Sequence, residues 1–124
     1  MKNNKIVSTI YILVAVFLII NGFVGCELAK NNIILIRESP DKKYNAVVFD
    51  RDAGSTTRIS YHLSILEAGD KFENLVGNIY ITYTEFEVTW IDEYTLYVTN
   101  IDVNPDSIFK QVREFGEVSI VYDN

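Results

Sequence analysis

The strongest constraint on the fold is an apolar/polar alternation with a period of two between residues 33 and 100. It recurs in six segments, 33–38, 44–51, 60–66, 77–83, 86–91 and 95–100. Such alternation is typical of strands that bury one face and expose the other. Turn residues separate the segments, as in "SPDK" and "EAGD". We therefore predict an all-β domain of six or seven short strands, with the closing segment 117–124 as the last strand.

One segment has a different pattern. In "NPDSIFKQVREFG" (104–116), Asn104 suits an N-cap and Pro105 suits a first helical position. Ile108, Val112 and Phe115 then recur at helical spacing, and a glycine follows. We predict one short helix here.

The order of these segments limits the architecture. No strand–helix–strand rhythm is present, so a doubly wound parallel sheet is excluded. We expect an antiparallel meander, a small sandwich or a partly closed barrel. Within 77–83 we expect Ile79, Ile81 and Tyr83 to share one face, and Trp90 to point inward with Phe86 and Val88.

The N-terminal segment is apolar. Two lysines precede Ile6–Gly25, which has no charged residue, and this pattern predicts an N-terminal hydrophobic helix that serves as an export signal or an anchor. Gly25 and Cys26 resemble the lipobox of bacterial lipoproteins, although Phe23 stands where leucine is usual. Two interpretations stay open, a lipidated Cys26 and an uncleaved membrane anchor. Both place the rest of the chain outside the cytoplasm.

These features divide the chain into a signal or anchor (1–26), a polar linker (27–32) and a β-domain (33–124). After Cys26 the chain has nine basic and seventeen acidic residues, a net charge of −8. An acidic domain is repelled by nucleic acid and by anionic surfaces, so we expect no nucleic-acid partner. The expected location is the cell membrane, with the domain on the extracytoplasmic side.

The most unusual polar stretch is the loop "DRDAGSTTR" (50–58). Its candidate binding residues are Asp50, Asp52, Gly54, Thr56, Thr57 and Arg58. One interpretation is contact with a protein or small ligand, since glycine allows close approach and the other side chains can form hydrogen bonds. A second is a structural loop, in which Asp52 caps backbone amides, Gly54 adopts positive φ and an arginine pairs with Asp50.

A cation site is a third interpretation of the same loop. The spacing of Asp50 and Asp52 is that of a calcium loop, but Gly54 comes one place early and no glutamate closes the loop. We therefore predict no metal and no cofactor.

Catalytic groups are sparse. His62 is the single histidine, and we expect it to occupy an ordinary position in a sheet, because no nucleophile–base pair stands out. Aromatic residues at strand spacing are expected to pack in the core rather than to form a ligand platform. These aromatic residues are Tyr80, Tyr83, Trp90, Tyr94 and Tyr97.

The stretch "SPDKKYNAVVFDRDAGSTTRISYHLSIL" (39–66) resembles the signature of a family of uncharacterised, membrane-attached proteins from Gram-positive bacteria. That signature runs SPDGKY, an apolar strand, R-D-x-G-x-T-T and a strand ending in S-I-L. Here Lys42 replaces the glycine, and Ala53 replaces a cysteine that many relatives carry. The resemblance extends more loosely to "VTWIDEYTLYV" (88–98). It implies a fold and a membrane location for a domain of unknown function, and it supplies no catalytic residues.

Together these features predict a membrane-tethered, extracytoplasmic binding domain without enzymatic activity. Its partner would contact the loop at 50–58 and the adjoining sheet edge. The alternative is an accessory or immunity-type protein that occludes a membrane partner through an outward sheet face. A hydrolase ranks last, because the sequence shows no pair of nucleophile and base.

Overall fold

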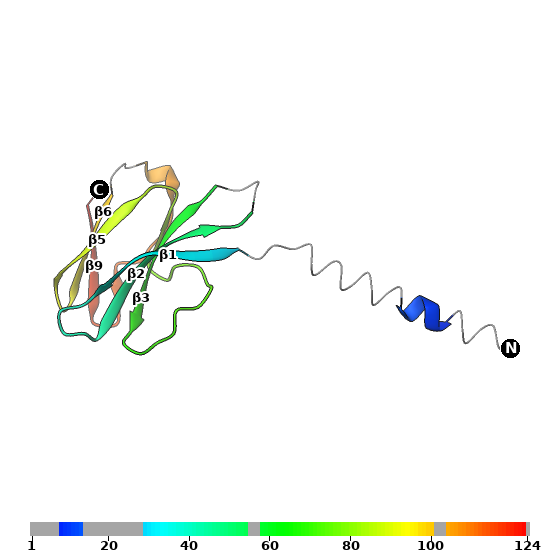
Figure 1. Cartoon of the computed structure of the whole chain (residues 1–124). Helices are drawn as coiled ribbons and strands as arrows, with labels where there is room; N and C mark the ends of the chain where they lie inside the picture. The colour runs from blue at the N-terminus through cyan, green and yellow to red at the C-terminus, as the bar shows by residue number, and fades with distance from the viewer. Residues whose placement is uncertain (1–7, 14–28, 55–57, 101–103, 124) are drawn as a thin grey trace.

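The computed structural model describes residues 8–13, 29–54, 58–100 and 104–123. The described part of the β-domain forms nine strands and one short 3₁₀ helix, η1 (Pro105–Ser107). The strands are β1 (Lys30–Glu38), β2 (Tyr44–Asp52), β3 (Ser60–Glu67), β4 (Tyr80–Thr82), β5 (Phe86–Asp92), β6 (Thr95–Asn100), β7 (Ile108–Gln111), β8 (Glu114–Phe115) and β9 (Val118–Asp123). They form a five-stranded sheet, β1-β2-β3-β4-β7, and a four-stranded sheet, β5-β6-β9-β8 (Figure 1).

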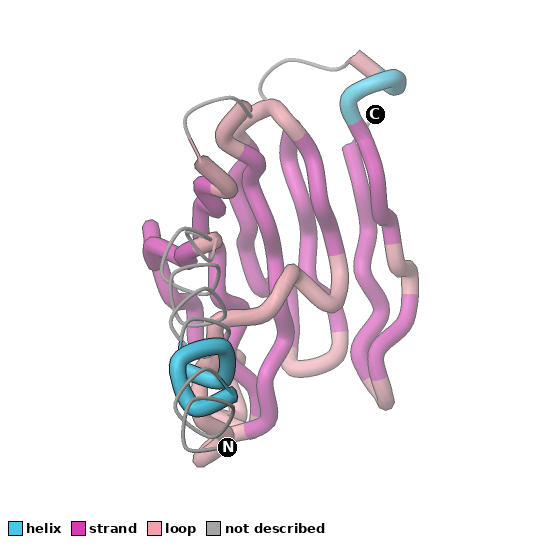
Figure 2. Tube along the Cα trace, turned by 90° about the vertical axis from the view of Figure 1, so that its right-hand side faces the viewer, coloured by secondary structure: helices cyan, strands magenta, loops and turns pink. Residues whose placement is uncertain are grey.

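The two sheets bury their facing surfaces against each other as a sandwich (Figure 2). Alternate residues of the strands enter one shared core, which explains the period of two in the sequence. Tyr80 is fully buried at the centre, with its ring 4.9 Å from that of Phe86 and 5.2 Å from that of Tyr122. The predicted all-β class with one short helix is therefore confirmed.

The first two strands form the predicted hairpin. Their antiparallel register runs from Lys30 opposite Asp52 to Glu38 opposite Asn45. Strand β1 begins three residues before the predicted start at Ile33, so residues 30–32 of the predicted linker belong to the sheet. The reason is that asparagine and lysine extend the ladder along β2, although they lack the apolar signal of a strand.

The turn between β1 and β2 is held by local hydrogen bonds. The amide of Ser39 donates to the carbonyl of Tyr44 (2.8 Å), and the Ser39 hydroxyl donates to Asp41 Oδ1 (2.7 Å). This hydroxyl lowers the pKa of the Asp41 carboxyl, because it stabilises the charged form. Lys42 adopts φ 63°, in the left-handed region that favours glycine.

The predicted helix over 104–116 is wrong beyond its first turn. The Asn104 side chain does accept a hydrogen bond from the amide of Asp106 (3.1 Å), as an N-cap does. The helical turn then ends at Ser107, and β7 pairs with β4 in the five-stranded sheet. Two short strands joined by turns place apolar residues at intervals of three and four, which a helix also does.

Two details of the strands lie outside what the sequence predicts. Strand β9 pairs with β6 in parallel, because the chain crosses to the other sheet through β7 before it returns. Tyr80 and Thr82 of β4 are buried, and so is Ile79 just before the strand, whereas Ile81 and the following Tyr83 are only half-buried. Burial of Tyr80 in the centre of the core decides which face of β4 points inward.

The outer face of the five-stranded sheet has a second, smaller core. The segment 68–79 crosses this face and places Phe72 edge-on against Phe49, with ring centres 5.1 Å apart. Phe49 in turn stacks on His62 at 5.1 Å. Both Phe49 and His62 are almost fully buried, so this segment is packed as part of the domain.

The N-terminal segment is described only over residues 8–13, which form a helical turn with all six residues exposed. Among the residues that the structure describes, no helix is both long enough and apolar enough to cross a bilayer. Cys26 and the rest of the apolar segment lie outside the described residues.

Candidate functional site

The candidate loop lies at the tip of the hairpin formed by β2 and β3. Thr56 and Thr57 lie outside the described residues. Asp52 Oδ1 accepts a hydrogen bond from the amide of Gly54 (3.0 Å), and Gly54 has φ 120°. The structure thus gives Asp52 and Gly54 the roles that the structural interpretation predicts.

Asp50 and the neighbouring Arg51 contact β1 across the sheet. Asn32 Nδ2 donates to Asp50 Oδ2 (3.4 Å), and Arg51 Nη1 donates to Asn31 Oδ1 (2.7 Å). The structure thus couples Arg51 to an asparagine instead of the predicted partner Asp50. Within the described ranges, no group of three or more His, Cys, Asp or Glu side chains could hold a metal ion.

A polar clamp fixes the start of β1. We use this name for Asn31, Arg51 and Asn74. The Asn31 amide donates to Asn74 Oδ1 (3.0 Å), and Asn74 Nδ2 donates to the carbonyl of Ala29 (2.8 Å). Asn31 Nδ2 donates to the carbonyl of Leu75 (2.6 Å). The clamp therefore ties the point where the chain enters the sheet to both β2 and the 68–79 segment.

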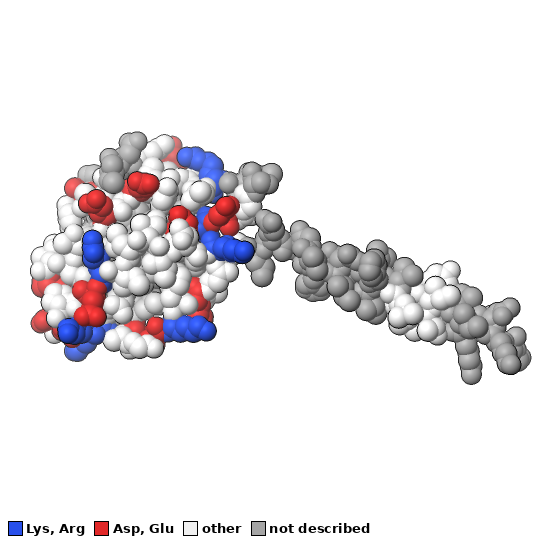
Figure 3. Space-filling view, viewed as in Figure 1, with Lys and Arg blue, Asp and Glu red and all other residues white. Residues whose placement is uncertain are grey.

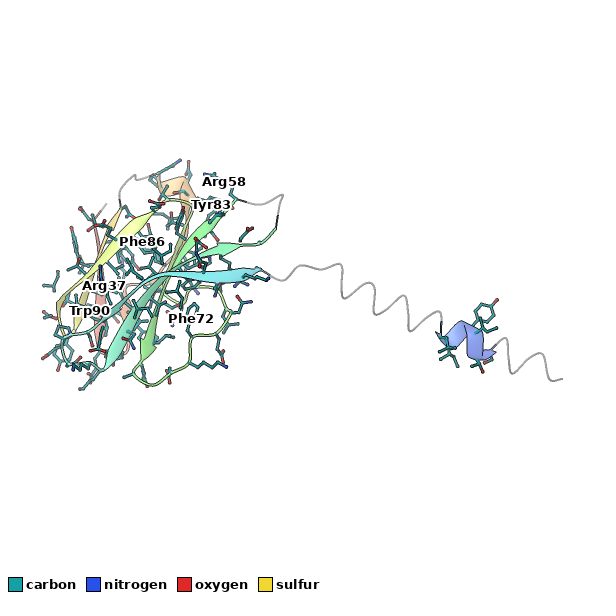
Figure 4. All side chains as sticks on the ribbon, viewed as in Figure 1. Arg37, Arg58, Phe72, Tyr83, Phe86 and Trp90 are labelled. Carbon is teal, nitrogen blue, oxygen red and sulfur yellow. The ribbon has the colours of Figure 1, made fainter. Side chains whose placement is uncertain are left out.

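Arg58 belongs to an exposed aromatic cluster on the other side of the hairpin tip. Its guanidinium lies over the ring of Tyr83, 4.6 Å from the centroid (Figure 4). The Tyr83 ring meets Phe109 edge-on, with ring centroids 4.6 Å apart. Phe109 is 58% exposed and Ile59 is 47% exposed. A cation over an aromatic ring beside exposed apolar side chains is a surface suited to contact.

His62 and Ser60 are 2.8 Å apart (Nε2 to Oγ), the distance of a base–nucleophile pair. However, His62 Nδ1 accepts a hydrogen bond from the amide of Gly77 (2.9 Å). The neutral ring must then carry its proton on Nε2 and donate it to Ser60, so Nε2 has no lone pair to deprotonate the serine.

Burial, together with the charges of Arg51 and Lys110, lowers the pKa of His62 to about 4. His62 is therefore neutral near pH 7 and locks the 68–79 segment onto β3. A Cβ built on Gly77 would lie 2.8 Å from the carbonyl oxygen of Leu63 and 3.0 Å from the Cβ of His62. Only glycine allows this close approach between the segment and the sheet.

The five-stranded sheet has two edge strands, β1 and β7, and β2 is the one described strand that pairs with β1. The outward positions of β1 carry Ile33, Ile34 and Ile36, which are 43%, 49% and 52% exposed. At the two ends this edge is closed, by the side chain of Asn74 at its start and by the indole of Trp90 at its end. Trp90 Nε1 donates to the carbonyl of Arg37 (2.8 Å; Figure 4). Residues 32–36 therefore form a short open edge with an apolar surface.

The described part of the chain has shallow hollows on its surface. One, of about 120 Å³, lies between β3 and the 71–78 segment, and another, of about 350 Å³, lies between the turns at 42–44 and 67–68. Sites for small organic ligands are usually enclosed and span about 300–1,000 Å³. The first hollow is too small for such a ligand, and only five residues of two surface turns line the second.

A family model matches residues 2–111 of the 124. The chain belongs to this family, DUF5412, whose function is unknown. No curated protein and no solved structure matches the chain. The DUF5412 match includes the whole of the uncharged segment 6–25, so this segment belongs to the pattern of the family together with the sheet.

Several residues that shape this DUF5412 domain are missed by the sequence interpretation. Asn31, Asn74 and Gly77 have no periodic signal, since each acts through a contact with a distant strand. Tyr83 and Phe109 meet only because β4 pairs with β7. The Pro-Asp-Lys turn and the glycine of the candidate loop are the features that local sequence does signal.

Proposed function

We propose that this DUF5412 chain is a membrane-tethered domain that faces the extracytoplasmic side and binds a membrane protein through the open edge of β1. The tether is the segment before Lys30, held either by a lipid on Cys26 or as an uncleaved span. The partner contributes a short extended segment, which adds to residues 32–36 beside the hairpin of the 50–58 loop.

Support for the tether comes from the sequence and the family match. Segment 6–25 has no charge and follows two lysines, as an export signal or anchor does. The family model includes it. Strand β1 starts only four residues after Cys26, so the domain follows the tether almost directly.

The observation that carries the binding proposal is the exposure of Ile33, Ile34 and Ile36 on an edge strand that pairs with a neighbouring strand on one side alone. An open strand presents backbone donors and acceptors that another chain can pair with, and natural proteins usually protect such edges with charges. Here three isoleucines occupy the edge instead. Strand addition supplies affinity through the backbone and specificity through such side chains.

A second candidate is the accessory or immunity-type role, in which the outer face of the four-stranded sheet occludes a membrane partner. The outward residues of β5, β6 and β9 are exposed or half-exposed, whereas the 68–79 segment covers the other sheet. Val121, 43% exposed, lies near the middle of this face on β9. The second candidate is favoured because the outer face of the four-stranded sheet is uncovered in the described part of the chain, whereas that of the five-stranded sheet is covered.

The proposal assigns no catalytic step. The proton on His62 Nε2 points to Ser60, so this pair supports a structural role. The described part of the loop also has structural hydrogen bonds, as in the contact between Asp52 and Gly54.

Site-specific photocrosslinking in the native membrane tests both candidates. A photoreactive residue at position 34 should give a discrete crosslinked protein, and the same residue at position 121 should not. The variant Ile34→Lys with Ile36→Lys should abolish the product crosslinked from position 33, while Val121→Lys should leave it intact. Product from position 121 alone would favour the outer sheet face and would contradict binding at β1.

A further inference from the structure

The exposed apolar residues near the tether point to a second surface, separate from the β1 edge. The geometry points to a lipid-contact surface at the tether end of the five-stranded sheet, formed by Ile59, Leu75, Val76 and Phe109. This inference rests on the membrane tether of the proposed function. Its occupant is the interfacial region of the same bilayer that holds the tether.

The position of the tether follows from the register of the sheet. Lys30 stands opposite Asp52, and Arg51 stands opposite Ser60. The next rows continue through β4 to β7, with Tyr61 opposite Thr82 and Thr82 opposite Ile108. The start of β1, the tip of the β2–β3 hairpin and the start of β7 therefore lie at one end of the sheet (Figure 1).

The chain between the tether and this end is short. Three residues separate Cys26 from Lys30, and the four residue-to-residue steps between them span at most about 14 Å when fully extended. The polar clamp also fixes the entry point, because Asn74 holds the carbonyl of Ala29 and the amide of Asn31. A domain held this closely and at a fixed point must present its tether end to the bilayer.

The side chains at this end suit an apolar interface. Leu75 and Val76 are 61% and 53% exposed beside the clamp, and Phe109 and Ile59 are 58% and 47% exposed beside Arg58 and Tyr83. Four such residues from three separate segments are not needed for the core of the sandwich. Apolar and aromatic side chains with nearby basic groups are typical of proteins that rest in the headgroup region.

Charge attraction does not drive this contact. The chain after Cys26 has a net charge of −8, and acidic and basic side chains are intermixed over the visible face of the domain (Figure 3). An anionic surface would repel such a domain. The apolar side chains are therefore the source of binding, and a zwitterionic bilayer is sufficient.

The surface also provides a second point of contact. Phe109 lies on β7, four strands away from β1, or about 19 Å at the usual strand spacing. Contact there, together with the tether at β1, would stop the domain from swinging. The β1 edge would then stand at a fixed height and orientation for its partner.

Tryptophan quenching in nanodiscs tests this inference. The full chain, in whichever mature form the membrane yields, is placed in phosphatidylcholine nanodiscs with acyl chains brominated near the glycerol. The single tryptophan is first removed with Trp90→Phe, and Phe109→Trp or Leu75→Trp is then added. The matched control is Ile91→Trp, because Ile91 is 62% exposed at the irregularity near the end of β5, at the opposite end of the sandwich.

Tryptophan at positions 109 and 75 should be quenched about twofold or more relative to tryptophan at position 91, as expected for side chains buried 5–10 Å into the interface. Leu75→Trp keeps the test valid if Phe109→Trp unfolds, since position 75 is highly exposed. Equal quenching at 109, 75 and 91, with the chain still migrating with the nanodisc, would overturn the lipid-contact surface and leave the tether intact. A chain that separates from the nanodisc would overturn both.

Discussion

Lys30 stands directly opposite Asp52 at the end of the antiparallel pair formed by β1 and β2. This pairing places the entry of the chain into the domain beside the hairpin that carries the candidate loop. It also directs β1 away from the tether with its open edge exposed. The proposed functions of the edge and of the tether end both depend on this register.

The close approach of Gly77 to β3 leads to a stability prediction. Gly77→Ala should lower the free energy of unfolding by about 2–3 kcal/mol, because its Cβ would overlap backbone rather than a flexible side chain. Urea denaturation at pH 7 measures this change. Gly69→Ala is the control, since Gly69 has φ 89° but open space around a Cβ, and it should cost only about 1 kcal/mol. Equal costs for the two variants would contradict the packing of the 68–79 segment.

His62 should make the domain less stable in acid. Its pKa is about 4 in the folded protein against 6.5 for the unfolded chain, so the unfolded state binds the proton first as pH falls. The stabilisation from neutral His62 is therefore complete above about pH 6.5 and is lost between pH 6.5 and 4. The loss should reach about 3 kcal/mol.

The measurement is urea denaturation at several pH values, with His62→Asn as the control. Asparagine retains an acceptor for the Gly77 amide but does not titrate. The free energy of unfolding of the wild-type protein minus that of His62→Asn should decrease as pH falls. Both proteins contain the same carboxylates, so the effect of carboxylate titration cancels in this difference. A difference that stays constant from pH 7 to pH 4 would show that His62 is not buried in its neutral form.

The turn at Lys42 offers a stabilising substitution. Lys42→Gly should raise the free energy of unfolding by about 0.5–1 kcal/mol, because φ 63° is strained for lysine and free for glycine. Thermal unfolding followed by circular dichroism measures it. Lys43→Gly, at the next residue, should not stabilise the domain, so a gain in both variants would argue for a nonlocal cause.

The polar clamp predicts a local change in dynamics. Asn74→Ala removes the acceptor of the Asn31 amide and the donor to the carbonyl of Ala29. Hydrogen exchange at the Asn31 amide should accelerate about tenfold, while exchange at Val48, in the core of β2, should not change. Unchanged exchange at Asn31 would show that the clamp does not fix the start of β1.

The sequence predicts the β class because strands with one buried face alternate apolar and polar residues with a period of two. Val88 and Val98, for example, are buried at the positions that alternation assigns. The segment 104–116 misleads because Ile108, Val112 and Phe115 lie in two short strands and a turn, and their spacing imitates a helix. Residues 108–111 form a strand because they pair with the free edge of β4, and local sequence does not reveal this partner.

The candidate site also has some contacts that local sequence predicts and others that depend on distant strands. Asp52 and Gly54 form a local turn, and local chemistry predicts it. Arg51 and Arg58 have partners twenty or more residues away, Asn31 and Tyr83, which only the sheet register brings near. The contact between Ser60 and His62 is not part of the sequence interpretation, and the Gly77 amide that fixes the proton of His62 comes from a segment fifteen residues away.

The central claim is that the segment before Lys30 delivers the domain across a membrane and holds it there. Reporters fused after Asn124 test this most directly. An alkaline phosphatase fusion, active only outside the cytoplasm, should be fully active in membranes, and a fluorescent protein that matures only in the cytoplasm should stay dark. A bright cytoplasmic fluorescent fusion with an inactive phosphatase fusion would contradict the account.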